Sequence, residues 1–284
     1  MQNIKENLFI KTTQVNMKTP MRSTIGSAGY DVFAHKDILL PSNKIISLEL
    51  PFTFYGDLEQ DVQIRLFDRS SYGIKKDVRL VYKEDKNIEY LTIDLSKENY
   101  VIDLINEGPE DLLIRKGEHF AQFIISDSQP EICKTVIEDV PFTEAEKHNI
   151  MPSKIIEVQP NVYDYIIQEP ITLKANEKRI FATGLRCLID EGTWTSITTH
   201  KDCKDKVMLA NQNGVIDRDY AYTDNFGHCF VALINLKNEE ITLPIGTNLL
   251  KWKTERYYTL SDEVKSNRVR TGGVGSTSKD KKEN

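Results

Sequence analysis

Two diverged copies of one pattern make up most of the chain, and this duplication constrains the fold more than any other feature. Tyr30-Asp31 in the first half recurs as Tyr163-Asp164 in the second, and each pair opens a strand-like run that ends in a polar turn. At the same spacing, Asp202-Cys203 falls where Arg69-Ser70 would sit. We therefore expect two tandem domains that share one topology.

Short strand-like runs dominate both copies, and helical periodicity is almost absent. Runs rich in β-branched and aromatic residues alternate with turn signals at the spacing typical of a β-sandwich or barrel. We expect strands in the first copy at residues 45–54, 61–66, 78–82, 90–95, 100–106 and 119–125. The predicted fold class is therefore all-β, with two tandem barrel or jelly-roll domains.

The predicted domain boundaries follow shifts in composition. The first β domain covers residues 1–126 and the second covers residues 161–260. Between them, residues 127–160 contain four prolines. They also contain a candidate helix that would begin at Thr143, with Glu146 completing a capping box, so we expect a linker. Residues 261–284 are polar and glycine-rich, which predicts a flexible C-terminal tail.

Composition and charge narrow the function classes. With 284 residues and 39% hydrophobic content, the chain can bury a sizeable core in each domain. Its net charge of −6 gives no general attraction to nucleic-acid backbones or anionic membranes, so we expect neither as a partner. We see no signal peptide and no segment able to span a bilayer. The four cysteines lack paired spacing, which favours reduced thiols in the cytoplasm or nucleus.

The stretch 213–222, NGVIDRDYAY, is the first functional candidate. Asn213-Gly214 favours a tight hairpin turn with positive φ. The strand-like run through Ile216 leads directly into Asp217 and Tyr220, which would hold a carboxylate and a ring near a rigid hairpin. Such a hairpin can read the edge of a small planar ligand. The alternative is an ordinary surface hairpin with solvated acids.

Polar residues of the first copy complement that stretch. Arg69, Ser70 and Ser71 place a cation beside two hydroxyls at a strand end, which suits an oxyanion; the alternative is a helix cap or turn. Gln122 interrupts an apolar strand, where a polar residue is usually the solvent face. The first copy combines these residues with Asp31 but has no Asn-Gly turn, whereas the second copy keeps NGVIDRDY and has lost the Arg-Ser pair and the glutamine. Each half therefore holds what the other lacks.

The tail contains a glycine-rich run that could bind phosphate. Residues 272–277, GGVGST, offer backbone N–H groups and the hydroxyls of Ser276 and Thr277. The run is not a P-loop, because no lysine follows in place and no strand and helix flank it.

Together these stretches resemble the five ordered motifs of the deoxyuridine triphosphatases (dUTPases). AGYDVFAHKD resembles the first motif, DRSSYG the second, NGVIDRDY the third, GEHFAQF the fourth and TGGVGSTS the fifth. Homotrimeric members of that family build each active site from three subunits, whereas herpesvirus-type members are single chains with a duplicated domain. This chain resembles the second type, with motifs one, two and four in the first half and three and five in the second. The resemblance implies a monomer with one composite site.

The resemblance also implies an activity, the Mg²⁺-dependent hydrolysis of dUTP to dUMP and pyrophosphate. Asp217 would orient and deprotonate the attacking water. Tyr220 would pack under the deoxyribose and leave no room for a 2′-hydroxyl. Backbone around Gly214 and Ile216, with Asn213, would read the uracil edge, because cytosine presents the reversed donor and acceptor pattern.

The phosphates would be held by other groups that the resemblance identifies. Asp31 would hold Mg²⁺ through water. Phosphate oxygens would contact Arg69, Ser70, Ser71 and Gln122. The tail would close over the nucleotide through Gly275, Ser276, Thr277 and either Arg270 or Arg268.

Some positions depart from the family pattern. Val274 stands where the fifth motif usually carries a phenylalanine that stacks on uracil, and His119 stands where an arginine is common in the fourth. Two other functions stay open: a dCTP deaminase or bifunctional relative, which shares the fold, and a dUTPase descendant that binds or regulates without catalysis. The intact NGVIDRDY stretch favours hydrolysis.

Overall fold

Strands dominate the computed structural model, which describes residues 8–13, 16–56, 61–82, 90–142, 149–263 and 266–272. Within these ranges the only α-helix is α1 (Ser70–Lys76). The first copy contains the strands β1 (Leu8–Thr12), β2 (Met21–Arg22), β3 (Tyr30–Phe33), β4 (Ile38–Leu40), β5 (Lys44–Glu49), β6 (Phe52–Gly56), β7 (Val62–Asp68), β8 (Val78–Leu80), β9 (Leu91–Ile93), β10 (Val101–Asn106), β11 (Leu112–Ile114) and β12 (His119–Asp127). The second copy contains β13 (Thr135–Asp139), β14 (Ser153–Gln159), β15 (Val162–Ile167), β16 (Ile171–Leu173), β17 (Lys178–Ala182), β18 (Leu185–Ile189), β19 (Thr193–Thr199), the 3-10 helix η2 (Lys201–Cys203), β20 (Val207–Leu209), β21 (Asn213–Asp217), the 3-10 helix η3 (Arg218–Tyr222), β22 (Phe230–Asn235), β23 (Ile241–Leu243) and β24 (Asn248–Arg256). The predicted all-β class is confirmed.

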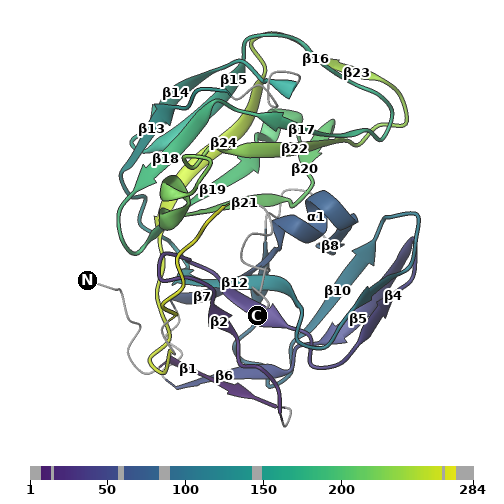
Figure 1. Cartoon of the computed structure of the whole chain (residues 1–284), viewed down its shortest axis with the longest axis vertical. Helices are drawn as coiled ribbons and strands as arrows, with labels where there is room; N and C mark the ends of the chain where they lie inside the picture. Colours follow the sequence, from purple (N-terminus) through teal and green to yellow (C-terminus); the bar gives the residue numbers. More distant parts are fainter. Residues whose placement is uncertain are drawn as a thin grey trace.

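Each copy builds the same set of sheets, which confirms the tandem duplication (Figure 1). The five-stranded sheets run β2-β3-β12-β7-β9 and β14-β15-β24-β19-β21. The three-stranded sheets run β5-β10-β8 in the first copy and β17-β22-β20 in the second. Each copy also has two two-stranded sheets: β1-β6 in the first copy corresponds to β13-β18 in the second, and β11-β4 corresponds to β16-β23. In Figure 1 the copies form a lower and an upper body, and α1 and β21 lie where the two bodies meet.

Two predictions of local structure are wrong. The expected linker over residues 127–160 contains β13 and β14, which pair with β18 and β15 as β1 and β2 pair with β6 and β3. Its proline-rich composition is local, whereas strand formation here depends on distant partners. The single strand expected over residues 45–54 is divided into β5 and β6 around Pro51, which has no backbone N–H for a ladder. The helix predicted at Thr143 lies outside the described residues.

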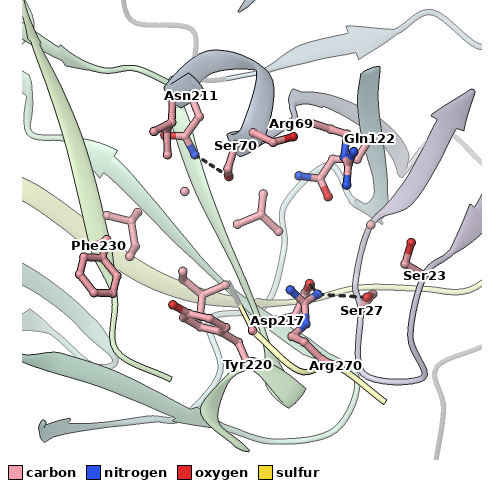
Figure 2. Close-up of a pocket in the computed structure, with 18 of the residues that line it drawn as sticks. Ser23, Ser27, Arg69, Ser70, Gln122, Asn211, Asp217, Tyr220, Phe230 and Arg270 are labelled. Carbon is pink, nitrogen blue, oxygen red and sulfur yellow. Dashed lines mark hydrogen bonds and ion pairs between the residues drawn. The ribbon is translucent and has the colours of Figure 1, made fainter. Parts of the chain in front are cut away.

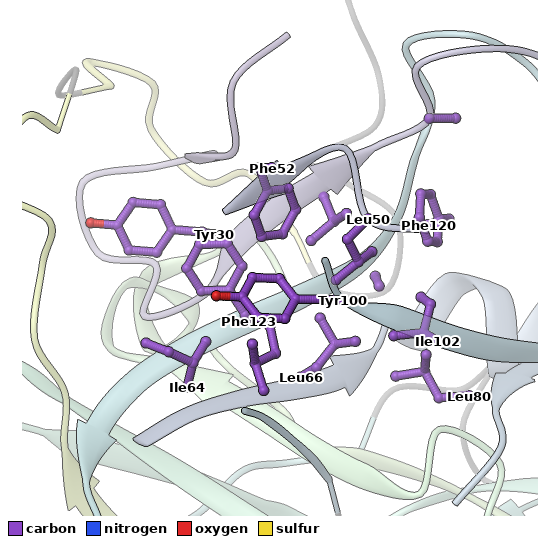
Figure 3. Packing of buried hydrophobic residues seen from close by; sticks show 14 of the residues in the cluster. Tyr30, Leu50, Phe52, Ile64, Leu66, Leu80, Tyr100, Ile102, Phe120 and Phe123 are labelled. Carbon is purple, nitrogen blue, oxygen red and sulfur yellow. The ribbon is translucent and has the colours of Figure 1, made fainter. Parts of the chain in front are cut away.

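Aromatic rings fill the core of the first copy (Figure 3). Phe123 of β12 stacks on Tyr30 of β3 with ring centroids 5.1 Å apart, and it meets Phe52 of β6 at 5.7 Å. Apolar burial contributes about 25 cal/mol per Å², and aromatic pairs of this kind add to it. This packing holds β3 and β12, the strands that carry Asp31 and Gln122, in a rigid sheet.

Buried contacts also join the two copies at their boundary. Phe67 of β7 meets Trp194 of β19 edge to face, with ring centroids 5.3 Å apart. Ile74 of α1 packs against Ala210 and Ala232 of the second copy. Side chains from both copies are therefore held at one interface.

After β24 the chain turns back over the first copy. The backbone N–H of Tyr258 donates to the carbonyl of Ile125, and that of Leu260 donates to the hydroxyl of Tyr30, both at 2.9 Å. Arg22 forms a buried ion pair with Glu263. This return path brings residues 266–272 back to the boundary between the copies.

Two general properties bear on the sequence predictions. No helix in the described ranges is long and apolar enough to cross a membrane. The four cysteines, Cys133, Cys187, Cys203 and Cys229, are buried as free thiols.

Candidate active site

A cavity of about 700 Å³ lies between the two copies (Figure 2). Asp31, Arg69 and Gln122 of the first copy line it, together with Asp217 and Tyr220 of the second. Its wall also contains the predicted site residues Ser70, Ser71, Gly214, Ile216 and Arg270. Neither copy supplies this set alone.

Arg69, Ser70 and Ser71 face the cavity at the start of α1. β7 ends at Asp68, Arg69 has the extended backbone of an N-cap residue, and the helix begins at Ser70. The alternative of a helix start is therefore confirmed, and the same residues line the cavity.

A close backbone contact sets α1 against the second copy. A Cβ on Gly73 would lie 2.9 Å from the carbonyl carbon of Ala210 and closer still to its oxygen, so only glycine permits this approach. Beside this contact, Asn211 Nδ2 donates to Ser70 Oγ at 3.1 Å. The pair is drawn as a dashed line in Figure 2. This hydrogen bond connects Ser70, which is predicted to contact phosphate, to the turn before β21.

Asp31 is a buried carboxylate with several polar partners. It lies opposite Gln122 in the pairing of β3 with β12. Its Oδ2 accepts from Ser23 Oγ and lies 2.9 Å from His119 Nδ1, and its Oδ1 lies 3.5 Å from Arg69 Nε. Burial raises the pKa of Asp31, but the contacts with His119 and Arg69 outweigh burial and hold the pKa below its usual value. Asp31 is therefore ionised at neutral pH.

The hairpin turn predicted at Asn213-Gly214 is wrong, because both residues lie within β21. The residue with positive φ is Gln212, at 55°. Gly214 instead pairs with Ile197 of β19. A Cβ added to Gly214 would lie only 3.2 Å from the Cβ of Ile197, so the absence of a side chain at Gly214 allows the two strands to pack closely. The side chain of Asn213 accepts from Ser196 Oγ at 3.1 Å, and Asn213 is absent from the described cavity wall.

Asp217 ends β21 with both carboxylate oxygens engaged. Oδ1 accepts the backbone N–H of Ala28 at 2.8 Å, and Oδ2 pairs with Arg270 Nη2. Arg270 Nε also donates to Asp219 at 2.8 Å. Burial raises the pKa of Asp217 to about 6, Arg270 opposes the rise, and the charge of Asp219 adds to it. Such a carboxylate is ionised at neutral pH and can accept a proton.

Two aromatic residues line the cavity away from Arg69 (Figure 2). The hydroxyl of Tyr220 donates to the carbonyl of His228 at 2.5 Å and accepts from Asn225 Nδ2 at 2.9 Å, which holds the ring in place. Phe230, the first residue of β22, lines the cavity as well. Phe230 could not be predicted from the sequence, because a single aromatic residue in a strand gives no sign of the surface that it faces.

Other lining residues were also missed. Ser23 and Ser27 lie in the loop between β2 and β3, directly before the first motif. Their position next to that motif was the one feature of the sequence that could have indicated that they line the cavity. Asn211 had no such signal, because its role depends on the contact with α1. The described tail reaches the cavity at Arg270, and Ser27 Oγ accepts from Arg270 Nη2 at 3.2 Å. Four tail residues named in the sequence analysis lie outside the described residues: Val274, Gly275, Ser276 and Thr277.

Comparison with known proteins identifies the family. A sequence model of the dUTPase family matches residues 159–278. The deoxyuridine 5′-triphosphate nucleotidohydrolase of Lactococcus lactis is 29% identical over 119 residues, which cover 40% of this chain and 79% of that protein. The enzyme of the same name from Yarrowia lipolytica is 31% identical over 121 residues, which cover 40% of this chain and 74% of that protein. The chain belongs to the dUTPase family.

Both of these matches cover 40% of this dUTPase but 79% and 74% of the relatives, so each match has about the length of one copy of the fold. A solved dUTPase from Streptococcus mutans aligns with 44% of this chain and 98% of its own, at 22% identity and a TM-score of 0.35. The family match covers the second copy, so the stretches that resemble motifs one, two and four lie outside it.

The structure corrects the predicted equivalence between the copies. Arg69 is the N-cap residue of α1 directly after β7, and His200 is the N-cap residue of η2 directly after β19. His200, rather than Asp202, is therefore the counterpart of Arg69. The spacing failed here because the copies differ by small insertions between the tyrosine-aspartate pair and this turn.

The second copy of the dUTPase retains a modified version of the Asp31 environment. Asp164 Oδ2 lies 3.7 Å from His200 Nε2, in the arrangement that Asp31 has with Arg69. Lys251 stands opposite Asp164 in the sheet, where Gln122 stands opposite Asp31. Asp164, His200 and Lys251 are absent from the described wall of the active-site cavity.

The cavity of the dUTPase suits a metal ion shared with phosphate. Among the described residues, no group of three or more His, Cys, Asp or Glu side chains could hold an ion. Mg²⁺ prefers oxygen ligands and is often held by one or two carboxylates together with substrate phosphates. The ionised Asp31 on the cavity wall fits this second arrangement.

Proposed function

We propose that this dUTPase hydrolyses dUTP to dUMP and pyrophosphate at one composite site per chain. One observation carries the proposal: Asp217 and Tyr220 of the second copy line the same cavity as Arg69, Ser70 and Gln122 of the first. The volume of about 700 Å³ lies within the range of small-molecule sites. The names of the relatives supply dUTP as the substrate.

The nucleoside would bind along β21. Among the described strands it is the last in its sheet, so the backbone groups on its outer edge lie outside the ladder with β19. Outer-edge groups between Gly214 and Ile216 can therefore pair with the uracil edge. Tyr220 would lie under the deoxyribose and exclude a 2′-hydroxyl, and Phe230 would offer the base an aromatic surface.

The phosphates would bind at the first-copy wall. The guanidinium of Arg69, the hydroxyls of Ser70 and Ser71 and the amide of Gln122 provide donors for phosphate oxygens. Mg²⁺ bound with the nucleotide would neutralise phosphate charge, and Asp31 would hold it through water.

Asp217 would act as the general base. The oxygen of water forms a bond to the α-phosphorus, the bond from that phosphorus to the bridging oxygen breaks, and the proton of water passes to Asp217 as pyrophosphate leaves. Arg270 pairs with the Oδ2 atom that would receive this proton. We infer that the triphosphate draws Arg270 from Asp217 onto phosphate oxygens, which frees the base when substrate is bound.

Pyrophosphate release from dUTP, dCTP, dTTP and UTP in the presence of Mg²⁺ tests this proposal. Release from dUTP alone is expected, and Asp217→Asn should lower kcat by about 10²- to 10⁴-fold with little change in KM. Ammonia release from dCTP would instead show a deaminase. Binding of dUTP without any turnover would show a regulatory protein.

The duplicated carboxylates provide a matched control for the composite site. Asp31→Asn changes the carboxylate on the cavity wall, and Asp164→Asn makes the same change at the equivalent position of the second copy. Loss of turnover is expected in the first variant only, with thermal midpoints measured for both. Equal losses in two folded variants would contradict a single site between the copies.

A further inference from the structure

A second cavity, of about 400 Å³, adjoins the active-site cavity at Arg69. Arg69, Ser71 and Lys75 line both cavities, so the wall that would hold phosphates continues from one into the other. We call the second cavity the basic pocket. Its lining comes from the segment around β2, from β3, from Arg69 and α1, from the start of β12 and the turn before it, and from Arg268 of the tail.

The basic pocket concentrates positive charge in a chain whose net charge is −6. Its cationic side chains are Lys18, Arg69, Lys75, Lys76 and Arg268. Among the described lining residues, Glu118 is the only acidic one, and it accepts the backbone N–H of Arg115 at 2.9 Å. Local charge of one sign in a concave site raises the concentration of ions of the opposite sign.

Two lysines of the basic pocket are held by aromatic rings. Lys18 Nζ lies 4.0 Å from the ring centroid of Phe33, and Lys76 Nζ lies 4.2 Å from that of Tyr72. Within the described residues, neither lysine has a carboxylate partner. A ring face positions an ammonium group without neutralising it, so both charges stay available to a ligand.

We propose that the basic pocket holds the end of a linear phosphate chain longer than three units, such as deoxyuridine 5′-tetraphosphate or inorganic tetrapolyphosphate. The inference rests on the proposed function, in which Arg69 and Ser71 contact the triphosphate. A fourth phosphate would then lie beyond Arg69, where Lys18 and Lys76 supply compact cations on flexible stems.

The proposal extends the reaction to a second substrate class. With deoxyuridine 5′-tetraphosphate, water again forms the bond to the α-phosphorus and its proton passes to Asp217. The bond from that phosphorus to the bridging oxygen breaks, and the leaving group is tripolyphosphate in place of pyrophosphate.

Calorimetric titration of the full chain in EDTA, where turnover is suppressed, tests the pocket directly. The probes are deoxyuridine 5′-tetraphosphate, dUTP and inorganic tetrapolyphosphate. The unaltered protein should bind the tetraphosphate about tenfold more tightly than dUTP, since two partly solvated charge contacts are gained. In the double variant Lys18→Ala/Lys76→Ala this ratio should fall to about one, and tetrapolyphosphate should bind about tenfold more weakly.

A charge-matched control separates the pocket from general electrostatics. Lys154→Ala/Lys174→Ala removes two exposed lysines of the second copy and should leave both measurements unchanged. The proposal is overturned if the control moves the ratio as much as the pocket variant does, or if the pocket variant leaves both measurements unchanged. Because tetrapolyphosphate carries no nucleoside, its lysine-dependent binding would support the pocket even if dUTP were not hydrolysed.

Discussion

The substitution Gly73→Ala tests the contact that brings the two copies together. Gly73 lies inside α1, so helix propensity alone predicts that alanine stabilises the protein by about 1 kcal/mol. The tertiary contact predicts the opposite sign, because the new Cβ would lie 2.9 Å from the carbonyl carbon of Ala210. The obstacle is backbone, which cannot rotate aside as a side chain can.

The expected magnitude follows from those two opposing terms. Overpacking a rigid contact costs about 1–3 kcal/mol, and the upper end applies because the second copy must shift as a body. Subtracting the helix gain leaves a net loss of about 2 kcal/mol, or roughly 5 °C in thermal midpoint for a protein of this size. Because the hydrogen bond from Asn211 to Ser70 lies beside the same contact, turnover of dUTP should fall by about tenfold or more.

Scanning calorimetry and steady-state kinetics measure the two effects on the same preparation. A lower midpoint together with lower kcat/KM is the expected result. A higher midpoint with full activity would refute the reasoning, since it would show that α1 behaves as an isolated helix and that the copies do not meet at Ala210.

Three further predictions concern buried charges. Because Asp217 has a pKa of about 6 and must be ionised to accept a proton, kcat/KM should fall about tenfold per pH unit below that value, and a pH profile that stays flat to pH 4 would contradict its role as base. Arg270→Ala removes the cation that lowers the pKa of Asp217, so the acid limb of the same profile should move to higher pH; an unchanged limb would show that the ion pair is absent in the enzyme before substrate binds. Burial raises the pKa of Asp68 to about 7, although its oxygens accept from Leu80 N and Gln212 Nε2, each at 2.6 Å. Since the unfolded pKa is about 3.9, the contribution of Asp68 to stability is complete below pH 4 and is lost as pH rises through 7, so Asp68→Asn should gain in thermal midpoint relative to the unaltered protein between pH 5 and pH 8.

The strand content could be predicted from sequence because its signals are local. Alternating apolar residues bury one face of a strand, and that alternation is present in segments such as β8 and β16 before any partner is known. The duplication was equally visible, since Tyr30-Asp31 and Tyr163-Asp164 each begin or lie within equivalent strands. Local signals failed for β13 and β14, whose extended form depends on pairing with β18 and β15.

The candidate site divides in the same way. The sequence by itself determined the chemical groups: a carboxylate at Asp217, a ring at Tyr220 and the donors of Arg69, Ser70 and Gln122. It also determined that the two copies hold complementary sets.

Only the tertiary structure decided which of these groups meet. It placed Gly214 against Ile197 in a strand, recruited Phe230 and Asn211, and set Arg270 on Asp217. The physical reason is that burial and charge pairing act between atoms that are close in space, and for most of this site those atoms are far apart in the chain. Residue types can be read along a sequence, whereas the pKa of Asp217 and the backbone contact at Gly73 exist only after the two copies have packed together.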